Sequence, residues 1–319
     1  MSTIGYHASH EQYAPSELLT HVRHAADAGF EAAMCSDHFH PWTREQGQSG
    51  FAWAWLGAAL QATPLSFGVV NAPGYRYHPA IIAQAAATLA ELYPDRFWLA
   101  IGSGEWLNEH ITGERWPPKE ERNQRLRECA DVMRALWAGE TVTHRGLVRV
   151  EDARLYTLPK QPPLLVGAAL TPATAEWLGG WADALVTTSQ PPDAMRRIID
   201  AFSRGGGADK PMFLQVQLGY ARTEEEAWRD AHGQWRSLMA GSAVLANLRN
   251  PAEFEEIGRF VRRADLEGHV RVSTDLEQHI AWLRHDAELG FERIYLHNVS
   301  REQARFIDDF GSRVLPALR

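Results

Sequence analysis

The chain alternates short apolar runs with longer amphipathic stretches, and this alternation repeats eight times along 319 residues. Each apolar run has the length of one buried strand, and each amphipathic stretch has the length of a helix. We expect strands at residues 4–8, 31–36, 66–71, 97–101, 164–168, 184–187, 212–218 and 293–297. We expect helices at residues 15–28, 51–62, 79–92, 119–138, 172–180, 191–204, 276–289 and 302–315.

Eight β–α units that close on themselves define the TIM (β/α)8 barrel, an α/β fold. A doubly wound open sheet is the rival architecture, but it usually has fewer strands. We therefore predict a single TIM-barrel domain over residues 1–319, with a hairpin or extended loop within residues 141–162. The helical segment at about residues 223–270 lies between the seventh strand and the seventh helix, so we interpret it as an insertion at the C-terminal face of the barrel.

Charge, apolar patterning and cysteine usage argue against a nucleic-acid-binding, secreted or membrane protein. The formal net charge is −8 and basic residues are scattered, which argues against a nucleic-acid partner. The N-terminus shows no signal-peptide pattern, and no run approaches the roughly 20 apolar residues that span a bilayer. Cys35 falls in an expected strand and Cys129 in an expected helix, so we expect no disulfide and a cytoplasmic location.

Polar side chains follow the expected strands, where a TIM barrel carries its catalytic groups. The second strand runs into Asp37 and His38 and opens into a loop that holds Trp42. The fourth strand leads through Gly-Ser-Gly to Glu105, and Glu11 follows the first strand. An imidazole can move a proton near neutral pH, so we predict His38 and Glu105 as an acid/base pair, with Trp42 and Glu11 as further candidate catalytic residues.

Each of these side chains also has a plain structural interpretation. His38 could bond a neighbouring carbonyl, and Trp42 could anchor the core. Asp37, Glu105 and Glu11 could each cap a helix.

Two neighbouring helix starts could hold a phosphate. Thr171 precedes one helix, and Thr188 and Ser189 precede the next. Helix N-termini present free N–H groups and a positive dipole end, and barrels often bind phosphate late in the chain. The alternative is ordinary capping by Thr and Ser.

Asp37, His38 and His40 together raise the question of a metal site. Barrel hydrolases usually gather further ligands from later strands, and here only His297 is available. We therefore expect no metal, and we keep a metal-dependent barrel hydrolase, built on Asp37, His38 and His297, as an alternative from another class.

The chain carries a joint set of motifs at residues 36–42 (Ser-Asp-His-Phe-His-Pro-Trp), 77–85, 102–105, 107–109, 136–139 and 188–189. This set resembles the bacterial luciferase-like superfamily of flavin and deazaflavin oxidoreductases. Within it, the chain is most similar to the branch of F420-dependent glucose-6-phosphate dehydrogenase. The resemblance is dense from residue 4 to about residue 140 and continues, more thinly, to the end.

The resemblance implies a barrel with insertions, usually dimeric, whose cofactor ring lies in the barrel mouth. It implies that His38 takes the hydroxyl proton, that Glu105 protonates the cofactor and that Trp42 shields the developing charge. It also implies a non-proline cis peptide near residues 70–71. The cofactor-binding residues that it implies, together with those inferred above, are Asp37, Val70, Asn71, Asn108, Ala169, Leu170, Thr171, Thr188 and Ser189.

The chain departs from the sugar-phosphate branch where that branch binds phosphate. Gln190 and Pro191 stand where Gly-Lys is expected, and Glu256 and His269 stand where basic residues are expected. A dianion without Lys or Arg partners loses its charge-assisted hydrogen bonds. We therefore expect a substrate other than glucose 6-phosphate, one that is uncharged or weakly charged, such as an alcohol or aldehyde.

Leu170 and Thr171 stand where the branch has Gly-Gly. This departure favours FMN over F420 and resembles a subgroup that has moved from F420 to a flavin. We predict a flavin- or deazaflavin-dependent oxidoreductase that acts on a small molecule and forms a homodimer. The alternative within the superfamily is a two-component monooxygenase that uses FMNH2 from a partner flavin reductase.

Overall fold

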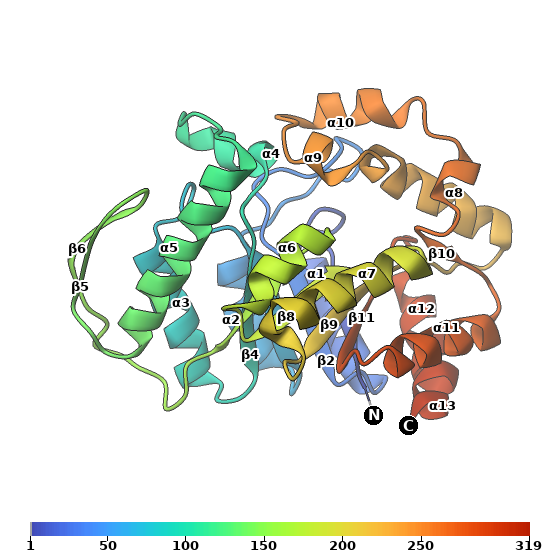
Figure 1. The fold of residues 1–319 in the computed structure, drawn as a ribbon. Coiled ribbons are helices and arrows are strands. Elements are labelled where there is room, and N and C mark those ends of the chain that lie inside the picture. The colour runs from blue at the N-terminus through green and yellow to red at the C-terminus, as the bar shows by residue number, and fades with distance from the viewer. Residues whose placement is uncertain (1) are drawn as a thin grey trace.

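The computed structural model describes residues 2–319, and eight parallel strands in it form a closed barrel (Figure 1). The barrel strands are β1 (Thr3–Ala8), β2 (Ala32–Ser36), β3 (Ser66–Asn71), β4 (Phe97–Ile101), β7 (Leu164–Ala168), β8 (Ala184–Thr188), β9 (Met212–Gly219) and β11 (Arg293–Asn298). Each strand pairs with the next, and β11 pairs with β1 to close the ring. The predicted TIM barrel is confirmed, and no strand boundary differs from its prediction by more than one residue.

Helices surround the barrel, and proline occupies the first turn of several of them, where its missing N–H costs nothing. The long outer helices are α1 (Pro15–Asp27), α2 (Ala52–Ala62), α3 (Pro79–Leu92), α5 (Lys119–Trp137), α6 (Pro172–Gly179), α7 (Pro192–Phe202) and α11 (Leu276–Glu288). Shorter helical turns are α4 (Trp106–Glu109), η1 (His110–Thr112) and η2 (Ser203–Gly207).

The last helix differs from its prediction. Instead of one helix over residues 302–315, the chain forms α12 (Gln303–Asp309), a π-helical turn η5 (Phe310–Val314) and α13 (Leu315–Leu318). Gly311 lies in the π turn, and a Cβ atom there would approach the Ala28 carbonyl oxygen to 2.6 Å. The helix therefore widens where its backbone packs closely against the end of α1.

A hairpin lies on the outer side of α5, within the segment where a hairpin or extended loop was expected (Figure 1). Its strands are β5 (Val142–Arg145) and β6 (Arg149–Ala153). Glu128 of α5 holds it, because its carboxylate lies 2.9 Å from the His144 ring and accepts the Leu147 N–H at 2.7 Å. The two-residue strand β10 (Arg271–Val272), which pairs with β9, was not predicted, since two residues carry no periodic signal.

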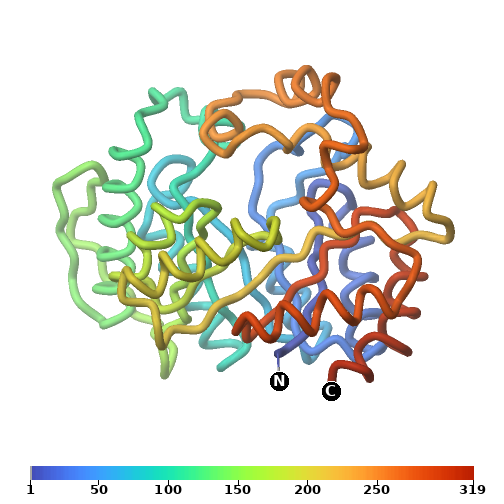
Figure 2. Tube along the Cα trace, turned by 45° about the vertical axis from the view of Figure 1, so that its right-hand side comes forward, coloured from blue at the N-terminus to red at the C-terminus, as the bar shows by residue number. Residues whose placement is uncertain are grey.

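The segment after β9 crosses the carboxyl end of the barrel and is the orange arch of Figure 2. It contains α8 (Glu224–Trp235), η3 (Arg236–Leu238), α9 (Ser242–Leu245), α10 (Pro251–Gly258) and η4 (Arg263–Leu266). Arg44 pairs with Glu255 of α10 through both carboxylate oxygens, at 3.2 and 3.0 Å from Nε. The Trp106 N–H donates to the Ala246 carbonyl at 3.1 Å. The arch is thereby tied to the loop after β2 and to α4.

The barrel interior is solid below its mouth. Trp98, Phe213 and Tyr295 are almost fully buried there, and the Trp98 indole N–H donates to the Tyr295 hydroxyl at 3.0 Å. Gly68 makes room for this packing, because a Cβ atom there would lie 1.9 Å from the Trp98 ring. A functional site must therefore lie above this layer, at the mouth. Within residues 2–319 no helix is long and apolar enough to cross a membrane.

Candidate active site

The centre of the mouth is an ion pair between two predicted catalytic residues. His38 follows β2 and Glu11 follows β1, and these strands are neighbours in the barrel. The His38 Nδ1 atom lies 2.6 Å from the Glu11 Oε1 atom, with 15% and 4% of the side chains exposed. Ser9 donates to the other Glu11 oxygen at 3.0 Å. The carboxylate is therefore fixed against the imidazole.

Burial and ion pairing shift the pKa values of His38 and Glu11 in opposite directions. Burial lowers the pKa of His38, but the charge of Glu11 and the hydrogen bond that the ring donates to it prevail, so the pKa lies above the ordinary 6.5. Burial would raise the pKa of Glu11, but the charge and hydrogen bond of His38 lower it to about 2. Since Nδ1 faces Glu11, Nε2 is the atom of His38 that can exchange a proton with a ligand.

Trp42 packs beside this pair. Its ring meets the His38 ring edge-to-face, with centroids 4.9 Å apart, and meets Phe254 of α10 at 5.2 Å. The structure therefore places the predicted shielding residue between the imidazole and the arch.

Glu105 reaches the same site from β4. The strand continues through Gly102 and Gly104, and Gly104 adopts a φ of +78°, which glycine tolerates. Burial raises the pKa of the Glu105 carboxyl, and the positive charge of His38 opposes that rise. The two predicted acid/base groups are thus close enough to act on each other electrostatically. Nearby, the Lys119 ammonium donates to the Ser103 hydroxyl at 2.6 Å.

Asp37 is held by a polar network at the end of β3. The Asn71 amide donates to its carboxylate at 2.7 Å, and the Tyr77 hydroxyl donates at 3.3 Å. The Arg76 guanidinium lies 3.7 Å from the same carboxylate and 3.4 Å from Glu109. Arg76 therefore links the loop that carries His38 to the helix that follows Glu105, a role that the sequence analysis missed.

One further prediction for this region needs correction. The Val70–Asn71 peptide is trans, not cis as the resemblance implied. The Asn108 oxygen accepts the backbone N–H groups of Phe39 at 2.9 Å and His40 at 3.2 Å, and the expected contact of its amide NH2 with a ligand stays a prediction. The Asn108 oxygen thus shapes the loop after His38.

The second group of predicted residues lies at the ends of β7 and β8. α6 and α7 pack side by side, so their N-termini are neighbours, as expected. Thr171 caps α6 by accepting the Thr174 N–H at 3.4 Å, and the Ser189 hydroxyl accepts the Gln217 N–H at 3.0 Å. Leu170 is 45% exposed, while Ala169 is buried. Thr188 is partly exposed at the end of its strand.

Between these groups, the ends of three neighbouring strands carry small side chains. Val70, Gly102 and Ala168 come from the adjacent strands β3, β4 and β7 or directly follow them. A Cβ atom added to Gly102 would meet only the Ala168 methyl group within 4 Å, at 3.8 Å. The buried Asn71 Oδ1 atom has no hydrogen-bond partner among residues 2–319. The open side of Gly102 and the free Asn71 oxygen are compatible with an isoalloxazine or deazaflavin ring at this position.

Asp37 and His297, two residues of the alternative metal site, form hydrogen bonds with other side chains. Asp37 is bound by Asn71 and Tyr77, and the His297 ring lies 3.2 Å from the Gln215 amide. Across residues 2–319, no three His, Cys, Asp or Glu side chains are grouped to hold a metal ion.

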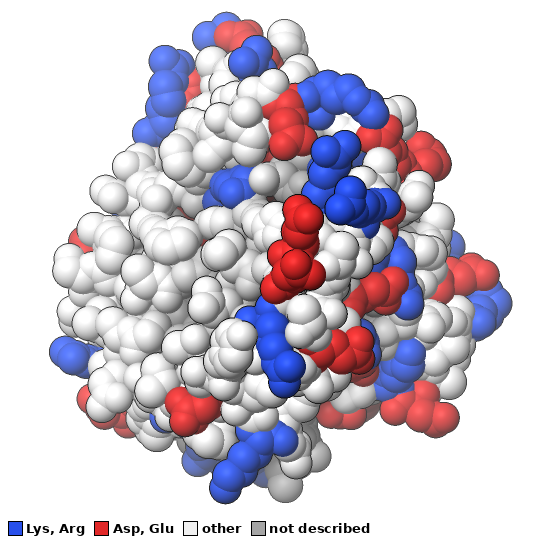
Figure 3. Space-filling view, turned by 90° about the vertical axis from the view of Figure 1, so that its left-hand side faces the viewer, with Lys and Arg blue, Asp and Glu red and all other residues white. Residues whose placement is uncertain are grey.

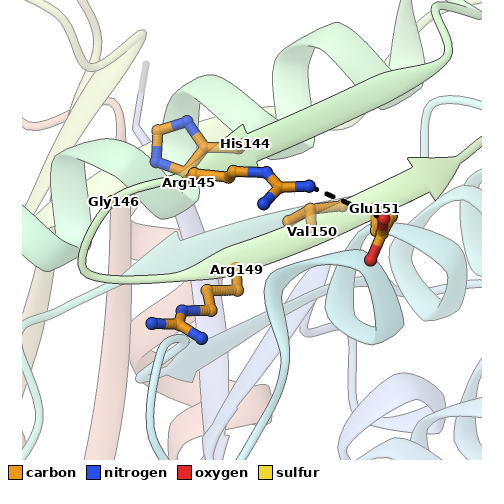
Figure 4. A pocket seen from close by; sticks show the side chains of 6 residues that line it. All are labelled: His144, Arg145, Gly146, Arg149, Val150 and Glu151. Atoms are coloured by element: carbon orange, nitrogen blue, oxygen red, sulfur yellow. Dashed lines mark ion pairs between the residues drawn. The ribbon is translucent and has the colours of Figure 1, made fainter.

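A separate surface pocket lies on the hairpin, outside α5, and has no part in the mouth. Its lining includes Arg145 and Glu151, which form an ion pair at 3.7 Å, and Arg149 (Figure 4).

The fold is a closed barrel whose mouth holds the His38–Glu11 pair beside small side chains of β3, β4 and β7. Residues 1–293 match the luciferase-like monooxygenase family, and the chain belongs to that family. The F420-dependent glucose-6-phosphate dehydrogenase of Intrasporangium calvum is 33% identical over 333 residues, covering 100% of this chain and 99% of the relative. That of Microbacterium testaceum is 33% identical over 328 residues, covering 99% and 97%.

Solved structures of F420-dependent enzymes are similar to this chain over its whole length. An F420-dependent secondary alcohol dehydrogenase, in complex with an F420-acetone adduct, superposes with a TM-score of 0.92 at 30% identity over all of both chains. The F420-dependent tetrahydromethanopterin reductase from Methanopyrus kandleri, at 16% identity and a TM-score of 0.81, shares the fold over 100% of this chain and 99% of the reductase. The predicted family and the luciferase-like oxidoreductase class are confirmed. These comparisons name F420 and lend no support to the preference for FMN.

Proposed function

We propose that this protein is an F420-dependent dehydrogenase that interconverts a small, uncharged alcohol and its carbonyl compound. The observation that carries the proposal is the buried His38–Glu11 pair, which lies at the mouth together with Glu105. The F420-dependent relatives, similar over the whole chain, support F420 as the cofactor.

When bound, the deazaflavin supplies the chemistry of accepting or releasing a hydride. Val70, Gly102, Ala168 and Asn71 would surround its ring. His38 accepts the hydroxyl proton at Nε2 during alcohol oxidation, and the Glu11 carboxylate stabilises the imidazolium that results. Glu105 is the second proton-transfer group, because burial lets it hold a proton to higher pH than an ordinary carboxyl.

The charges around the mouth support an uncharged substrate. Most arginines of the arch and of the loop beneath it are paired with carboxylates, so those arginines offer little net positive charge to a phosphate. These pairs are Arg44–Glu255, Arg236–Glu45, Arg259–Glu256, Arg262–Asp265 and Arg263–Glu224. Arg249 is the exception, because its guanidinium lies over the Trp106 ring, 5.6 Å from the ring centroid.

The experiment is F420-linked oxidation of secondary alcohols by the wild-type protein and by His38→Ala. We expect turnover by the wild type and a loss of about 10²- to 10⁴-fold in His38→Ala. The exposed His285→Ala variant is the matched control and should keep wild-type activity. Equal activity of wild type and His38→Ala, or no oxidation of any alcohol, would overturn the proposal.

We also propose that the protein is cytoplasmic and forms a homodimer through α2 and α3. α2 has no charged residue, α3 has only Glu91, and Phe51 and Ile81 are 56% and 57% exposed. The left half of Figure 3 shows a broad area of the surface that is almost free of charged side chains. Sedimentation should give twice the 35.8 kDa mass of the chain, and Ile81→Glu should return it to one chain.

A further inference from the structure

Two positive side chains lie on the first turn of α5, next to the mouth. Lys119 and Arg122 are three residues apart, so they share one face of the helix. The Lys119 ammonium donates to the Ser103 hydroxyl at 2.6 Å, and the Arg122 Nη1 atom donates to the Gly104 carbonyl at 3.1 Å. Both cations therefore contact the Gly-Ser-Gly loop that joins β4 to Glu105.

Neither cation has a carboxylate partner. Among residues 2–319, Lys119 and Arg122 form the two hydrogen bonds above and no ion pair with an Asp or Glu side chain. Arg122 is only 4% exposed, its Nε atom has no hydrogen-bond partner within the same residues, and its guanidinium lies 4.4 Å from the centroid of the Trp116 ring. A buried arginine is rare unless it is paired. This face of α5 therefore lacks a counter-charge.

The charges around Lys119 show the same deficit. Partial burial of the ammonium and the positive charge of Arg122 lower the pKa of Lys119 to about 8. The charges of Glu105 and Glu120 oppose this shift without cancelling it. Glu105 compensates poorly, because burial raises its own pKa and favours its uncharged form. Two like charges held close together are unfavourable, so a bound anion would stabilise both cations.

These cations lie beside the position that suits the cofactor ring. Ser103 directly follows Gly102, whose open side faces Ala168 of the neighbouring strand β7. After β7, where the related branch has Gly-Gly, the Thr171 hydroxyl is used to cap α6. FMN and F420 both carry a phosphate on the chain that leaves the ring. A ring against Gly102 can therefore extend its phosphate to Ser103 and to the Lys119 ammonium, 2.6 Å from that hydroxyl.

We propose that the Lys119 ammonium binds the phosphate of the cofactor and that Arg122 adds its charge from behind, so that the protein selects a phosphorylated deazaflavin over one that ends at the ribityl chain. The inference rests on the proposed function for the identity of the ring. Lys119 is exposed and can meet a ligand, whereas Arg122 is buried and acts through its charge. An ammonium forms charge-assisted hydrogen bonds with phosphate oxygens, and the N-terminus of α5 adds a positive dipole end.

The test measures the dissociation constants of F420 and of the tail-free deazaflavin by quenching of tryptophan fluorescence. We expect the wild type to bind F420 about 10- to 100-fold more tightly than the tail-free form. Lys119→Met should lose most of that preference through weaker binding of F420, and Lys119→Arg should retain much of it. Lys160→Met removes an exposed lysine before β7 and is the matched control, with unchanged binding expected.

Two further titrations separate the sources of the phosphate. FMN and riboflavin differ only in the phosphate, so any preference for FMN should also depend on Lys119. Inorganic phosphate should weaken the binding of F420 to the wild type and leave the binding of the tail-free form unchanged.

Equal affinity of the wild type for both deazaflavins, or an F420 affinity that is unchanged in Lys119→Met, would overturn the role of Lys119 and leave the dehydrogenase proposal intact. Inorganic phosphate that binds without displacing F420 would also overturn it and identify free phosphate as the ligand. A protein that prefers FMN to riboflavin through Lys119 but does not bind F420 would support the role of Lys119 and overturn the proposed use of F420.

Discussion

Replacement of Glu11 by Gln tests how the mouth activates its base. The carboxylate lies 2.6 Å from the His38 ring, and both side chains are buried. Hydrogen bonds to charged groups contribute about 1.5–3 kcal/mol, and each 1.36 kcal/mol is a factor of ten in rate. Because Gln keeps the shape and removes the charge, we expect kcat/KM for alcohol oxidation to fall about 10- to 100-fold.

The same substitution should also shift the pH profile of alcohol oxidation, and the direction of that shift follows from the pKa of His38. Alcohol oxidation needs neutral His38, and the pKa of His38 is raised above 6.5 by Glu11, so wild-type activity increases as pH rises through that pKa. Without the carboxylate, burial dominates and lowers the pKa of His38. The acid limb of the profile should therefore move to lower pH in Glu11→Gln, and the activity deficit should shrink in acid.

The assay is kcat/KM for alcohol oxidation between about pH 5 and pH 9, followed by the absorbance of the deazaflavin. Glu225→Gln removes an exposed carboxylate from α8 and serves as the matched control, with an unchanged profile expected. A Glu11→Gln profile whose acid limb stays in place, or an activity equal to wild type, would refute the reasoning.

Two further predictions concern the free energy of unfolding, which chemical denaturation measures. Gly68→Ala should lower the free energy of unfolding by ~3 kcal/mol, because its Cβ would lie 1.9 Å from the Trp98 ring, and a loss below ~1 kcal/mol would contradict that packing. Arg76→Gln should lower it by ~3–5 kcal/mol, because Asp37 and Glu109 lose their buried counter-charge. Burial raises the pKa of Glu109 to about 7, so this second deficit should shrink as pH falls, and a deficit that grows in acid would count against the role.

The barrel could be predicted from sequence because local signals agree along its whole length. Apolar runs such as β3 (Ser66–Asn71) are bounded by polar segments, and prolines such as Pro79 mark where helices begin. The break in the last helix could not be predicted, since it depends on the contact between Gly311 and Ala28, which are distant in sequence.

For the site, the sequence identified residues but not their partners. His38, Glu11 and Glu105 could be selected because they follow strands whose carboxyl ends meet in a barrel. The direction of the His38 ring toward Glu11 depends on side-chain geometry, and the link made by Arg76 depends on a loop without periodicity.

Titration of the apo-protein with F420, FMN and reduced FMN, followed by quenching of tryptophan fluorescence, tests the central claim most directly. Trp42 and Trp106 lie at the mouth, so a ring bound there should quench their emission. If the protein is an F420-dependent dehydrogenase, we expect tight binding of F420 and weak binding of both forms of FMN. Tight binding of FMN with weak binding of F420 would contradict the proposal that F420 is the cofactor, and it would favour a flavin-dependent enzyme.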